Sequence, residues 1–516
     1  MAITRRQFLK RSALAAAGVA ASPYMRWVPG TNVSWAAGPT NKIVVIVQLN
    51  GGNDGLGTVY PLGPNGPGTQ RGNYESIRPT LAQPDTDGGV ASVYSSVFPN
   101  ATSVLSVGQD IDGDEYALHP VMTRLHNIWN AGEMAICTGV HYPHSNHSHF
   151  RSSDIWYTGD PLGNGGQGWF GSYLDTVGFS PTDVPVVIMD NQLNPVFTPT
   201  TASLFAIKRL DNLVFPATGT NTEQSLKQAA IQSILGDAAS LDPAVVPELV
   251  KIGQTGDATL MKMGEYYTGN GFPGDGNTAR VEPLLLNSSG KYKRNNDLVY
   301  NSPLNGLSGG LARDLRHVAA IIRSTQGGNV GACYFHVDKG GFDTHSNQEK
   351  GFFHSSLWFE VSEAVGAFYE DMSQSISLPS TGGYDAANYR TGSLVNEVVI
   401  VTFSEFGRTM AQNAAGANTA GTDHAASAPQ IVMGGQVQGG LYGPYPKLDD
   451  PSAARDNDLK YVFDVRDFYG TILNRWLGVS SGAIAGSGSG FIFPLTPELD
   501  DDGRNYTGYT PIPFLL

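Results

Sequence analysis

Residues 43–55 read IVVIVQLNGGNDG, an apolar run that ends abruptly in two glycines, an amide and a carboxylate. Three later apolar runs, at residues 134–140, 330–337 and 397–403, also end in polar clusters. Runs of this length that are rich in Val and Ile are typical of strands buried on both faces of a parallel sheet. Ligands bind beyond the carboxyl ends of the strands in such sheets, so the polar clusters predict a site there.

Composition and charge narrow the class of protein. The chain has 516 residues, of which 41% are hydrophobic and 15% are charged, as expected for a packed globular protein. This length permits two or three domains or one large α/β unit. The formal net charge of −14 argues against nucleic acid or anionic lipid as a partner. No segment after the N-terminal region approaches the roughly 20 apolar residues that span a bilayer, so we expect no stable membrane span.

The N-terminal segment indicates export. Residues 4–10 read TRRQFLK, which is typical of a twin-arginine signal, and Trp35, Ala36 and Ala37 offer a processing region. The first 37 residues contain five Arg and Lys and no Asp or Glu. We therefore expect a signal peptide at residues 1–37, the twin-arginine translocase as a transient partner, and a periplasmic or secreted mature protein. The alternative is an ordinary basic amphipathic start.

Apolar runs alternate with helical periodicity along most of the chain. Helical spacing is found in five stretches outside residues 195–310: 119–131, 150–157, 311–324, 352–372 and 467–477. Within residues 195–310 it is found at 222–235 and 245–252. This order predicts one doubly wound α/β domain over residues 38–516, with an insertion or cap at residues 195–310. Cys137 and Cys333 lie inside predicted strands, where cysteines are usually buried hydrophobes. A disulfide between them is the alternative.

The polar clusters carry residue types that bind divalent metal ions. Asp54 stands in a glycine-flanked turn, where a ligand can approach the backbone closely. Asp343 and His345 follow a buried strand and two glycines, and together they offer an oxygen and a nitrogen ligand. Glu405 follows the strand at 397–403, and His424 lies in a loop of small residues. These five residues are the predicted metal ligands.

Each predicted ligand also has a simpler interpretation. Asp54 could form an Asx turn, and the aspartate and histidines of the later loops could be ordinary solvated side chains. Glu405 could form a structural ion pair with Arg408, because both groups are costly to bury unless they are paired. The sequence leaves these alternatives open.

An anion-binding helix terminus is predicted beside these residues. Residues 141–151 contain four histidines and two serines ahead of a predicted helix. A helix N-terminus stabilises an anion, and Arg151 adds a bidentate donor. Ser148 is the predicted nucleophile, because a metal could lower the pKa of its hydroxyl, and Arg408 is predicted to help to hold the anion. The simpler interpretation is that Ser148 only caps the helix.

Taken together, the motifs resemble the bacterial DUF1501 family of twin-arginine-exported proteins over nearly the whole chain. They are LNGGNDG at 49–55, LHP at 118–120, SHF at 148–150, DIW at 154–156, GFDTH at 341–345, SEFGRT at 404–409 and TDH at 422–424. That family is similar to the alkaline phosphatase/sulfatase superfamily. The resemblance implies an alkaline phosphatase-like sandwich, with a mostly parallel central sheet flanked by helices and a two-metal site at the strand ends.

The resemblance also implies roles for single residues. Carried over residue by residue, it implies metal ligands at Asp54, Asp343, His345 and His424. Ser148 falls in the region of the superfamily's nucleophile. Glu405 and Phe406 stand where the superfamily usually has Asp and His. Because phenylalanine cannot bind a metal, one of the two ion sites is expected to be weak or absent.

Two functions follow from these observations. The leading one is an exported metal-dependent hydrolase of phosphate or sulfate esters, with one or two divalent ions (zinc, calcium, manganese or iron). Ser148 or a water would attack, and Arg151 and Arg408 would hold the anionic group of a small-molecule or polysaccharide ester. The alternative is a non-catalytic periplasmic or cell-surface binding or assembly protein with a degenerate metal site, since fold alone does not decide function.

Overall fold

A computed structural model describes residues 41–145, 147–162, 167–177, 186–188, 204–206, 310–323, 333–375, 390–448, 458–487, 491–495 and 506–515. The signal peptide predicted at residues 1–37 and nearly all of the insertion predicted at residues 195–310 lie outside the described residues. Within the described part of the chain, no helix has the length and apolar character that crossing a membrane requires.

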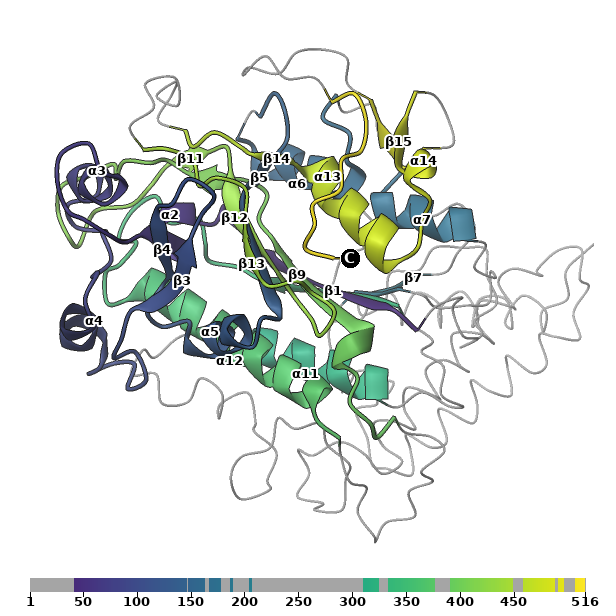
Figure 1. The fold of residues 1–516 in the computed structure, drawn as a ribbon, viewed down its shortest axis with the longest axis horizontal. Coiled ribbons are helices and arrows are strands. Elements are labelled where there is room, and N and C mark those ends of the chain that lie inside the picture. The colour runs from purple at the N-terminus through teal and green to yellow at the C-terminus, as the bar shows by residue number, and fades with distance from the viewer. Residues whose placement is uncertain are drawn as a thin grey trace, which may run out of the picture.

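A nine-stranded sheet forms the centre of the molecule (Figure 1). The strand order is β13-β5-β12-β9-β1-β8-β6-β7, and β14 pairs with β5. Neighbouring strands are parallel except at β12, which runs antiparallel to both β5 and β9. The strands are β1 (Ile43–Leu49), β5 (Met134–His141), β6 (Val186–Ile188), β7 (Leu204–Ala206), β8 (Tyr334–Lys339), β9 (Val398–Phe403), β12 (Ala428–Met433), β13 (Gly440–Tyr442) and β14 (Phe463–Asp464). The predicted α/β class with a mostly parallel central sheet is confirmed.

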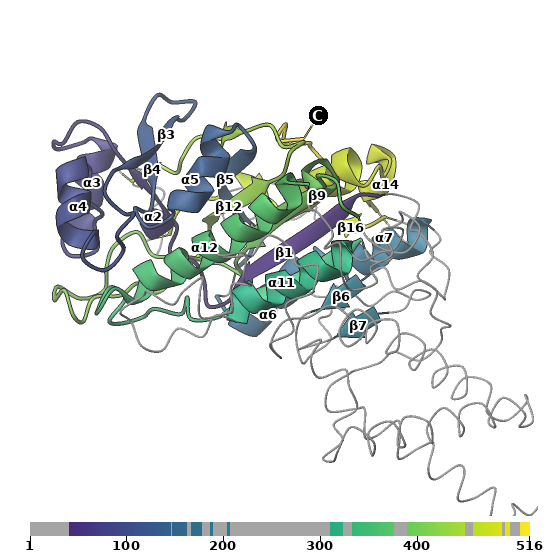
Figure 2. The same cartoon turned by 90° about the horizontal axis from the view of Figure 1, so that it is seen from below.

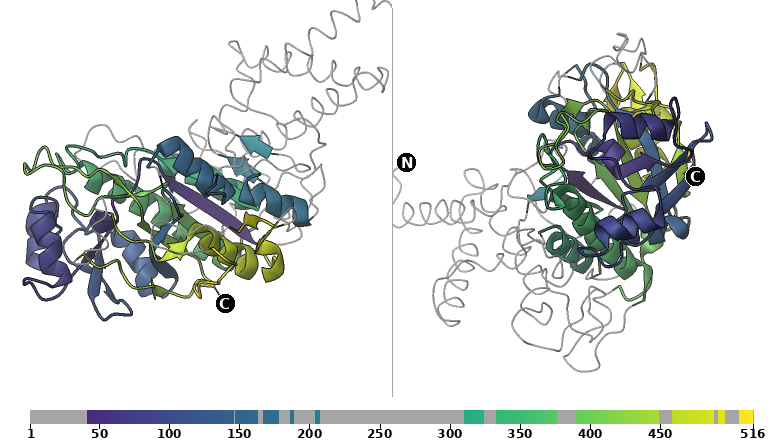
Figure 3. Two further views of the ribbon diagram at one scale, coloured as in Figure 1. Left: turned by 90° about the horizontal axis from the view of Figure 1, so that it is seen from above. Right: turned by 90° about the vertical axis from the view of Figure 1, so that its left-hand side faces the viewer.

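Helices cover both faces of this sheet (Figures 1 and 3). One face carries α5 (Thr123–Asn130), α11 (Gly310–Arg323) and α12 (Phe353–Ser373). The other carries α6 (His149–Thr158), α7 (Trp169–Val177), α13 (Val465–Thr471) and the π-helix η7 (Ile472–Trp476). Successive residues of β1 alternate between the two layers: Val45 packs in the core with α11 and α12, and Val44 packs in the core with α6 and α13. Because both faces are covered, every residue of β1 is buried.

The smaller elements lie around this core. The three-stranded sheet β2-β4-β3 and the helices α3 and α4 gather at one end of the molecule (Figure 2). Their bounds are β2 (Val59–Pro61), β3 (Leu105–Gln109), β4 (Glu115–Leu118), α3 (Gln70–Ile77) and α4 (Asp87–Tyr94). The remaining short elements are α2 (Gly55–Thr58), η6 (Val395–Glu397), β10 (Gly407–Arg408), β11 (His424–Ala425), α14 (Ser481–Ile484), β15 (Ala485–Gly486) and β16 (Phe493–Pro494).

Most helices predicted from periodicity form close to their expected bounds, with two differences. The helix predicted at 119–131 begins at Thr123, because residues 119–122 form a turn in which the Met122 N–H donates to the carbonyl of His119 at 2.9 Å. The helix predicted at 467–477 begins at Val465 and passes into the π-helix η7.

Both cysteines are buried and free, so the prediction that they serve as small hydrophobes is confirmed. Cys137 lies in β5 and Cys333 directly precedes β8. Burial raises the pKa of both thiols, that of Cys333 to about 12, so neither forms a reactive thiolate near neutral pH.

The register of the three central parallel strands brings their carboxyl ends to one edge. Leu49 of β1 lies opposite Lys339 of β8, and Gln48 of β1 lies opposite Phe403 of β9. The segments that follow these strands therefore meet at the same edge, where ligands bind in sheets of this type.

Candidate functional site

At this edge, one aspartate and three histidines bring their side chains together. The Oδ1 atom of Asp343 lies 3.1 Å from Nε2 of His345 and 3.1 Å from Nε2 of His424. Those two ring nitrogens are 2.9 Å apart. Nε2 of His149 lies 3.5 Å from the other carboxylate oxygen of Asp343. We call these four residues the Asp343 cluster.

Separate parts of the fold supply the four residues. Asp343 and His345 lie in the segment after β8, whose Phe342 N–H donates to the Asn50 carbonyl at 3.1 Å and so ties the segment to the end of β1. His149 is the first residue of α6. His424 lies in β11, which pairs with β10 so that His424 faces Arg408 across the ladder.

Each histidine of the Asp343 cluster is oriented through its Nδ1 atom. The acceptors are the Glu405 carboxylate for His149 at 2.8 Å, the Asp423 carboxylate for His345 at 2.9 Å, and the His147 carbonyl for His424 at 3.0 Å. An Nδ1–H that donates to such an acceptor leaves the lone pair on Nε2. Metal-binding histidines in proteins are held in the same way. All three Nε2 atoms are therefore prepared to bind one ion beside Asp343.

The charges of the cluster favour a cation. Burial opposes ionisation of Asp343, but the hydrogen bond from Arg408 and the positive charge of its guanidinium outweigh it and help to lower the pKa of this carboxyl to about 2. Burial lowers the pKa of His424, which keeps its ring neutral and able to act as a ligand. The hydrogen bond to Glu405 raises the pKa of His149, so binding an ion there would displace a proton.

The spacing of the donor atoms also fits a single ion. Ligand atoms that share one zinc at about 2.0–2.1 Å lie about 3.3–3.4 Å from one another in tetrahedral geometry. The three separations among Asp343, His345 and His424 are 2.9, 3.1 and 3.1 Å, so small movements of the side chains would admit an ion. The side chain of Asp343 is 49% exposed, so the cluster opens to solvent on one side. The residues present fit a divalent cation with nitrogen and oxygen ligands, and they leave access for a second molecule.

Arg408 lies fully buried beneath Asp343. Its Nε donates to the carbonyl of Gly52 at 2.8 Å and its Nη1 donates to the carbonyl of Thr422 at 2.9 Å. Its Nη2 donates to Asp343 Oδ1 at 2.7 Å and to the carbonyls of Phe342 and Gly51. In this arrangement Arg408 fixes Asp343 and the surrounding backbone. The prediction that it holds a substrate anion stays a prediction.

Glu405 is also buried, behind the cluster. Its Oε1 accepts hydrogen bonds from the Gly51 N–H at 2.8 Å and from His149 at 2.8 Å. Contact with an ion through Oε1 would compete with both bonds, whereas Oε2 has no hydrogen-bond partner among the described residues. Through Oε1, Glu405 orients His149. The ligand role predicted for Glu405 is not tested by these contacts.

Asp54 lies apart from the four residues of the cluster. It is buried, and its Oδ2 accepts hydrogen bonds from Arg78 at 2.6 Å and from Gln348 at 2.6 Å. The guanidinium of Arg78 outweighs the effect of burial and lowers the pKa of Asp54, so the pair is ionised. Gln348 accepts in turn from the Thr422 hydroxyl at 2.8 Å, which links Asp54 to the loop that carries His424. The ligand role of Asp54 stays a prediction.

Ser148 and Arg151 lie at the start of α6. Ser148 occupies the N-cap position, but its side chain makes no capping hydrogen bond, so the interpretation that its hydroxyl caps the helix is wrong. One neighbour, His149, belongs to the Asp343 cluster, and the carbonyl of the other, His147, faces Nδ1 of His424. Ser148 therefore lies beside the cluster. Arg151 donates from Nη2 to the carbonyl of Pro161 at 2.8 Å. Their catalytic roles stay predictions.

Phe406 forms an apolar wall behind two of the histidines. Its ring centroid lies 4.8 Å from that of His149 and 4.4 Å from that of His424. Gly52, at a φ of +83°, allows this approach, because a Cβ there would lie 2.5 Å from the Phe406 ring. Gly51, at a φ of +121°, leaves room in the same way, since its Cβ would lie 2.2 Å from the backbone nitrogen of Asp343. The glycine pair that ends the first apolar run is therefore a packing requirement of the site.

Sequence reasoning missed two members of this arrangement, His149 and Asp423. His149 stood in the histidine-rich segment, but the segment alone did not show which histidine would face the strand ends. Asp423 directly precedes His424 in the motif TDH, and this adjacency was the available signal. Its actual partner is His345, 78 residues earlier in the chain, so the pairing depends on the fold.

Comparisons with known proteins relate part of the chain to a family and the fold to one solved structure. Residues 387–501 match the model of a family described as "Protein of unknown function (DUF1501)", which confirms the predicted resemblance to DUF1501. A solved structure described as a protein in the alkaline phosphatase superfamily from Vibrio parahaemolyticus is similar at a TM-score of 0.30 and 8% sequence identity. That similarity covers 86% of this chain and 68% of the other. No curated protein matches the chain.

Proposed function

We propose that the protein is a metal-dependent hydrolase that acts on phosphate or sulfate esters. The observation that carries this proposal is the common orientation of three histidines: each Nδ1 faces an oxygen acceptor, and each Nε2 faces Asp343. The side chain of Asp343 is 49% exposed, so a substrate could reach the ion from this side, as in catalytic metal sites. A divalent ion held there would polarise an ester oxygen.

The chain's own residues would prepare the site for such a substrate. Arg408 holds Asp343 in place through the 2.7 Å hydrogen bond, and Glu405 and Asp423 hold two of the histidines. The proposed nucleophile is Ser148, which lies between His147 and His149 in the sequence. A water molecule is the alternative nucleophile. Phe150, which follows His149, is 88% exposed and offers an apolar surface for the organic part of the ester.

The proposal places the protein outside the cytoplasm after export through the twin-arginine pathway. The support is the sequence TRRQFLK at residues 4–10, whose arginine pair is followed by a weakly apolar stretch. A reporter enzyme fused after residue 37 and expressed in strains with and without the twin-arginine translocase tests this part. Export that continues without the translocase would contradict it.

One observation favours a second candidate function, a metal-dependent binding protein without catalysis. The nitrogens of Arg408 already donate to the protein itself, and Arg151 donates to Pro161. The donors of Arg408 are therefore engaged within the protein, and one nitrogen of Arg151 is engaged as well. Such a protein would bind the ion and a partner molecule through the same open side, without turnover.

An assay of ester hydrolysis distinguishes the hydrolase from the metal-dependent binding protein. Protein treated with a chelator is reloaded with zinc, manganese, calcium or ferrous iron and assayed on aryl phosphate and aryl sulfate esters. We expect one ion to restore hydrolysis, and His424→Ala to lower kcat/KM by several orders of magnitude. His126→Ala, which alters a histidine of α5 outside the cluster, serves as the control and should keep full activity. Metal binding without hydrolysis of any ester would favour the binding protein.

A further inference from the structure

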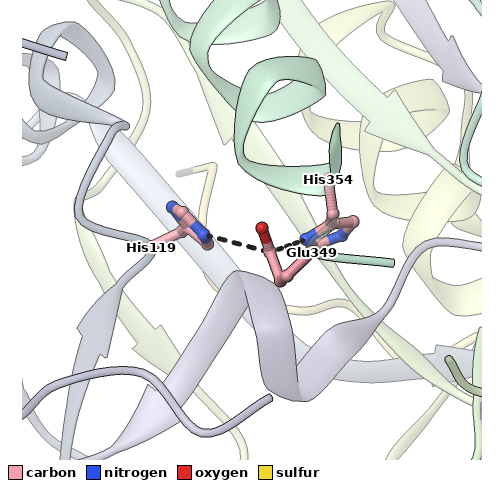
Figure 4. A group of neighbouring side chains, drawn as sticks. All are labelled: His119, Glu349 and His354. Atoms are coloured by element: carbon pink, nitrogen blue, oxygen red, sulfur yellow. Dashed lines mark ion pairs between the residues drawn. The ribbon is translucent and has the colours of Figure 1, made fainter. Parts of the chain in front are cut away.

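A second group of metal-binding residue types lies inside the protein, with no member in common with the Asp343 cluster. It comprises His119, Glu349 and His354, whose side chains point toward one another with the carboxylate between the two imidazoles (Figure 4). His119 follows β4, Glu349 lies in the segment between β8 and α12, and His354 lies in the first turn of α12. Both imidazoles are fully buried, and the glutamate side chain is 15% exposed.

The distances within this group are too long for strong hydrogen bonds. Oε1 of Glu349 lies 3.4 Å from Nδ1 of His354 and 3.8 Å from Nε2 of His119. Donor atoms bound to one zinc at about 2.0–2.1 Å lie about 3.3 Å apart in tetrahedral geometry, and somewhat farther apart when the angle between them opens. The three donor atoms all lie within 4.8 Å of one another, so an ion between them needs only small side-chain movements.

Several polar atoms of the group are buried without a hydrogen-bond partner among the described residues. They are Oε1 of Glu349 and both ring nitrogens of His354. The other carboxylate oxygen of Glu349 accepts from the Ser355 hydroxyl at 2.7 Å. An unsatisfied buried polar group costs about 1–3 kcal/mol, and more when it is charged. A bound cation would satisfy the orphaned carboxylate oxygen and one nitrogen of His354 together.

The carboxylate of Asp54 and the glycine at position 57 also support a cation site beside His354. A Cβ at Gly57 would lie 2.7 Å from Oδ2 of Asp54 and 2.9 Å from Cε1 of His354, so this glycine leaves the space between the two side chains open. Two carboxylates thus border His354, while Arg78 pairs with only one of them, Asp54. At His119, the Val121 N–H lies 3.4 Å from Nδ1 and the Ser355 hydroxyl lies 3.3 Å from Nε2. Both contacts are long, and an ion bound at Nε2 would replace the contact with Ser355 and weaken the one at Nδ1.

We propose that His119, Glu349 and His354 hold a structural divalent cation, with Zn²⁺ the best match to two imidazoles and a carboxylate. Full burial of both imidazoles excludes a substrate, so this site is closed. The ion would join the end of β4, the segment after β8 and the start of α12. The segment after β8 also carries Asp343 and His345, so the buried ion would hold the Asp343 cluster in position from the interior of the protein. This inference goes beyond the proposed function and stands whether or not the protein is a hydrolase.

The test first removes the Asp343 cluster and then measures the number of metal ions bound per chain. The variant Asp343→Ala/His424→Ala lacks two donors of the Asp343 cluster and keeps the buried group. We expect it to retain about one equivalent of Zn²⁺ by elemental mass spectrometry, and Co²⁺ in its place to give the visible absorption of a low-coordinate cobalt site. Adding His354→Gln should abolish both signals, whereas adding His126→Gln should leave them unchanged.

Three results would overturn the proposal. The first is a folded Asp343→Ala/His424→Ala protein that binds neither Zn²⁺ nor Co²⁺. The second is retention of the cobalt absorption after His354→Gln is added. Because His354→Gln could unfold the chain, Glu349→Gln is measured in parallel, since its amide can still accept from Ser355. Circular dichroism establishes folding, and a folded Glu349→Gln variant that binds zinc with unchanged affinity also overturns the proposal.

Discussion

Replacing Arg408 with Lys should destabilise the protein strongly, because Arg408 holds together several segments of the site. Its guanidinium donates to the carbonyls of Gly52 and Thr422 at 2.8 and 2.9 Å, and to Asp343 at 2.7 Å. It also donates to the carbonyls of Gly51 and Phe342. A lysine amine has three hydrogens on a single atom and cannot span these separated acceptors.

The magnitude follows from burial. Arg408 is 0% exposed, so solvent cannot replace the lost partners. A buried acceptor that is left without a donor typically costs about 1–3 kcal/mol, and lysine leaves several of the four carbonyls around Arg408 unsatisfied. We therefore expect Arg408→Lys to lower the free energy of unfolding by about 3–5 kcal/mol. Metal affinity should fall as well, because Asp343 loses the bond that fixes its carboxylate.

Urea unfolding monitored by circular dichroism measures the first effect, and competition with a chromophoric chelator measures the second. The matched control is Arg124→Lys, because Arg124 pairs with Glu363 and Glu370 on α12 and is 28% exposed. Exposed pairs contribute about 0–1 kcal/mol, so the control should change stability little. An Arg408→Lys protein as stable as the control would refute this account of Arg408. If KM rose at unchanged stability, a role in holding the substrate anion would be supported instead.

Three further predictions concern separate features of the fold. Glu405→Gln should weaken metal binding roughly 10–100-fold, because His149 loses its charged acceptor; chelator competition measures this, and unchanged affinity would contradict the role given to Glu405. Gly421→Ala should lower the free energy of unfolding by about 1–3 kcal/mol in urea, since the new Cβ would lie 2.3 Å from the carbonyl carbon of His345; wild-type stability would show that the loop moves freely. Asp467→Asn should change the pH dependence of stability: burial raises the pKa of Asp467 to about 7 from its ordinary value of 3.8, so this carboxyl stabilises the fold at low pH and loses that contribution as pH rises through about 7. The urea midpoint of the variant, relative to that of the wild type, should therefore be higher at pH 8 than at pH 5, and an equal difference at both values would contradict the shift.

The strands of the central sheet could be predicted because they are buried on both faces. Every position of β1, β5 and β9 is buried, and this burial is visible in the sequence as runs of mostly apolar residues. The direction of β12 could not be predicted in this way. An antiparallel strand buried in the same layers has the same residue pattern, and only its connections decide how it runs.

The candidate site was predicted in part. Asp343 and His345 follow the parallel strand β8, whose end meets the end of β1. His424 joins them because it precedes β12, and the antiparallel direction of β12 brings its first residues to the same edge. His149 joins them through α6, and its orientation depends on Glu405, 256 residues away. The buried group of His119, Glu349 and His354 left no local signal, since its members come from three separate places in the fold. Local patterns thus predict which edge carries the chemistry, and long-range packing decides which side chains point into it.

The central claim is that Asp343, His345, His424 and His149 hold one divalent ion. X-ray diffraction from crystals grown with Zn²⁺, with data collected on both sides of the zinc absorption edge, tests it most directly. The account predicts an anomalous peak about 2.0–2.2 Å from the Asp343 carboxylate and from the Nε2 atoms of His345 and His424, with His149 facing the same ion. A well-ordered edge of the sheet with no anomalous peak among these side chains would contradict it.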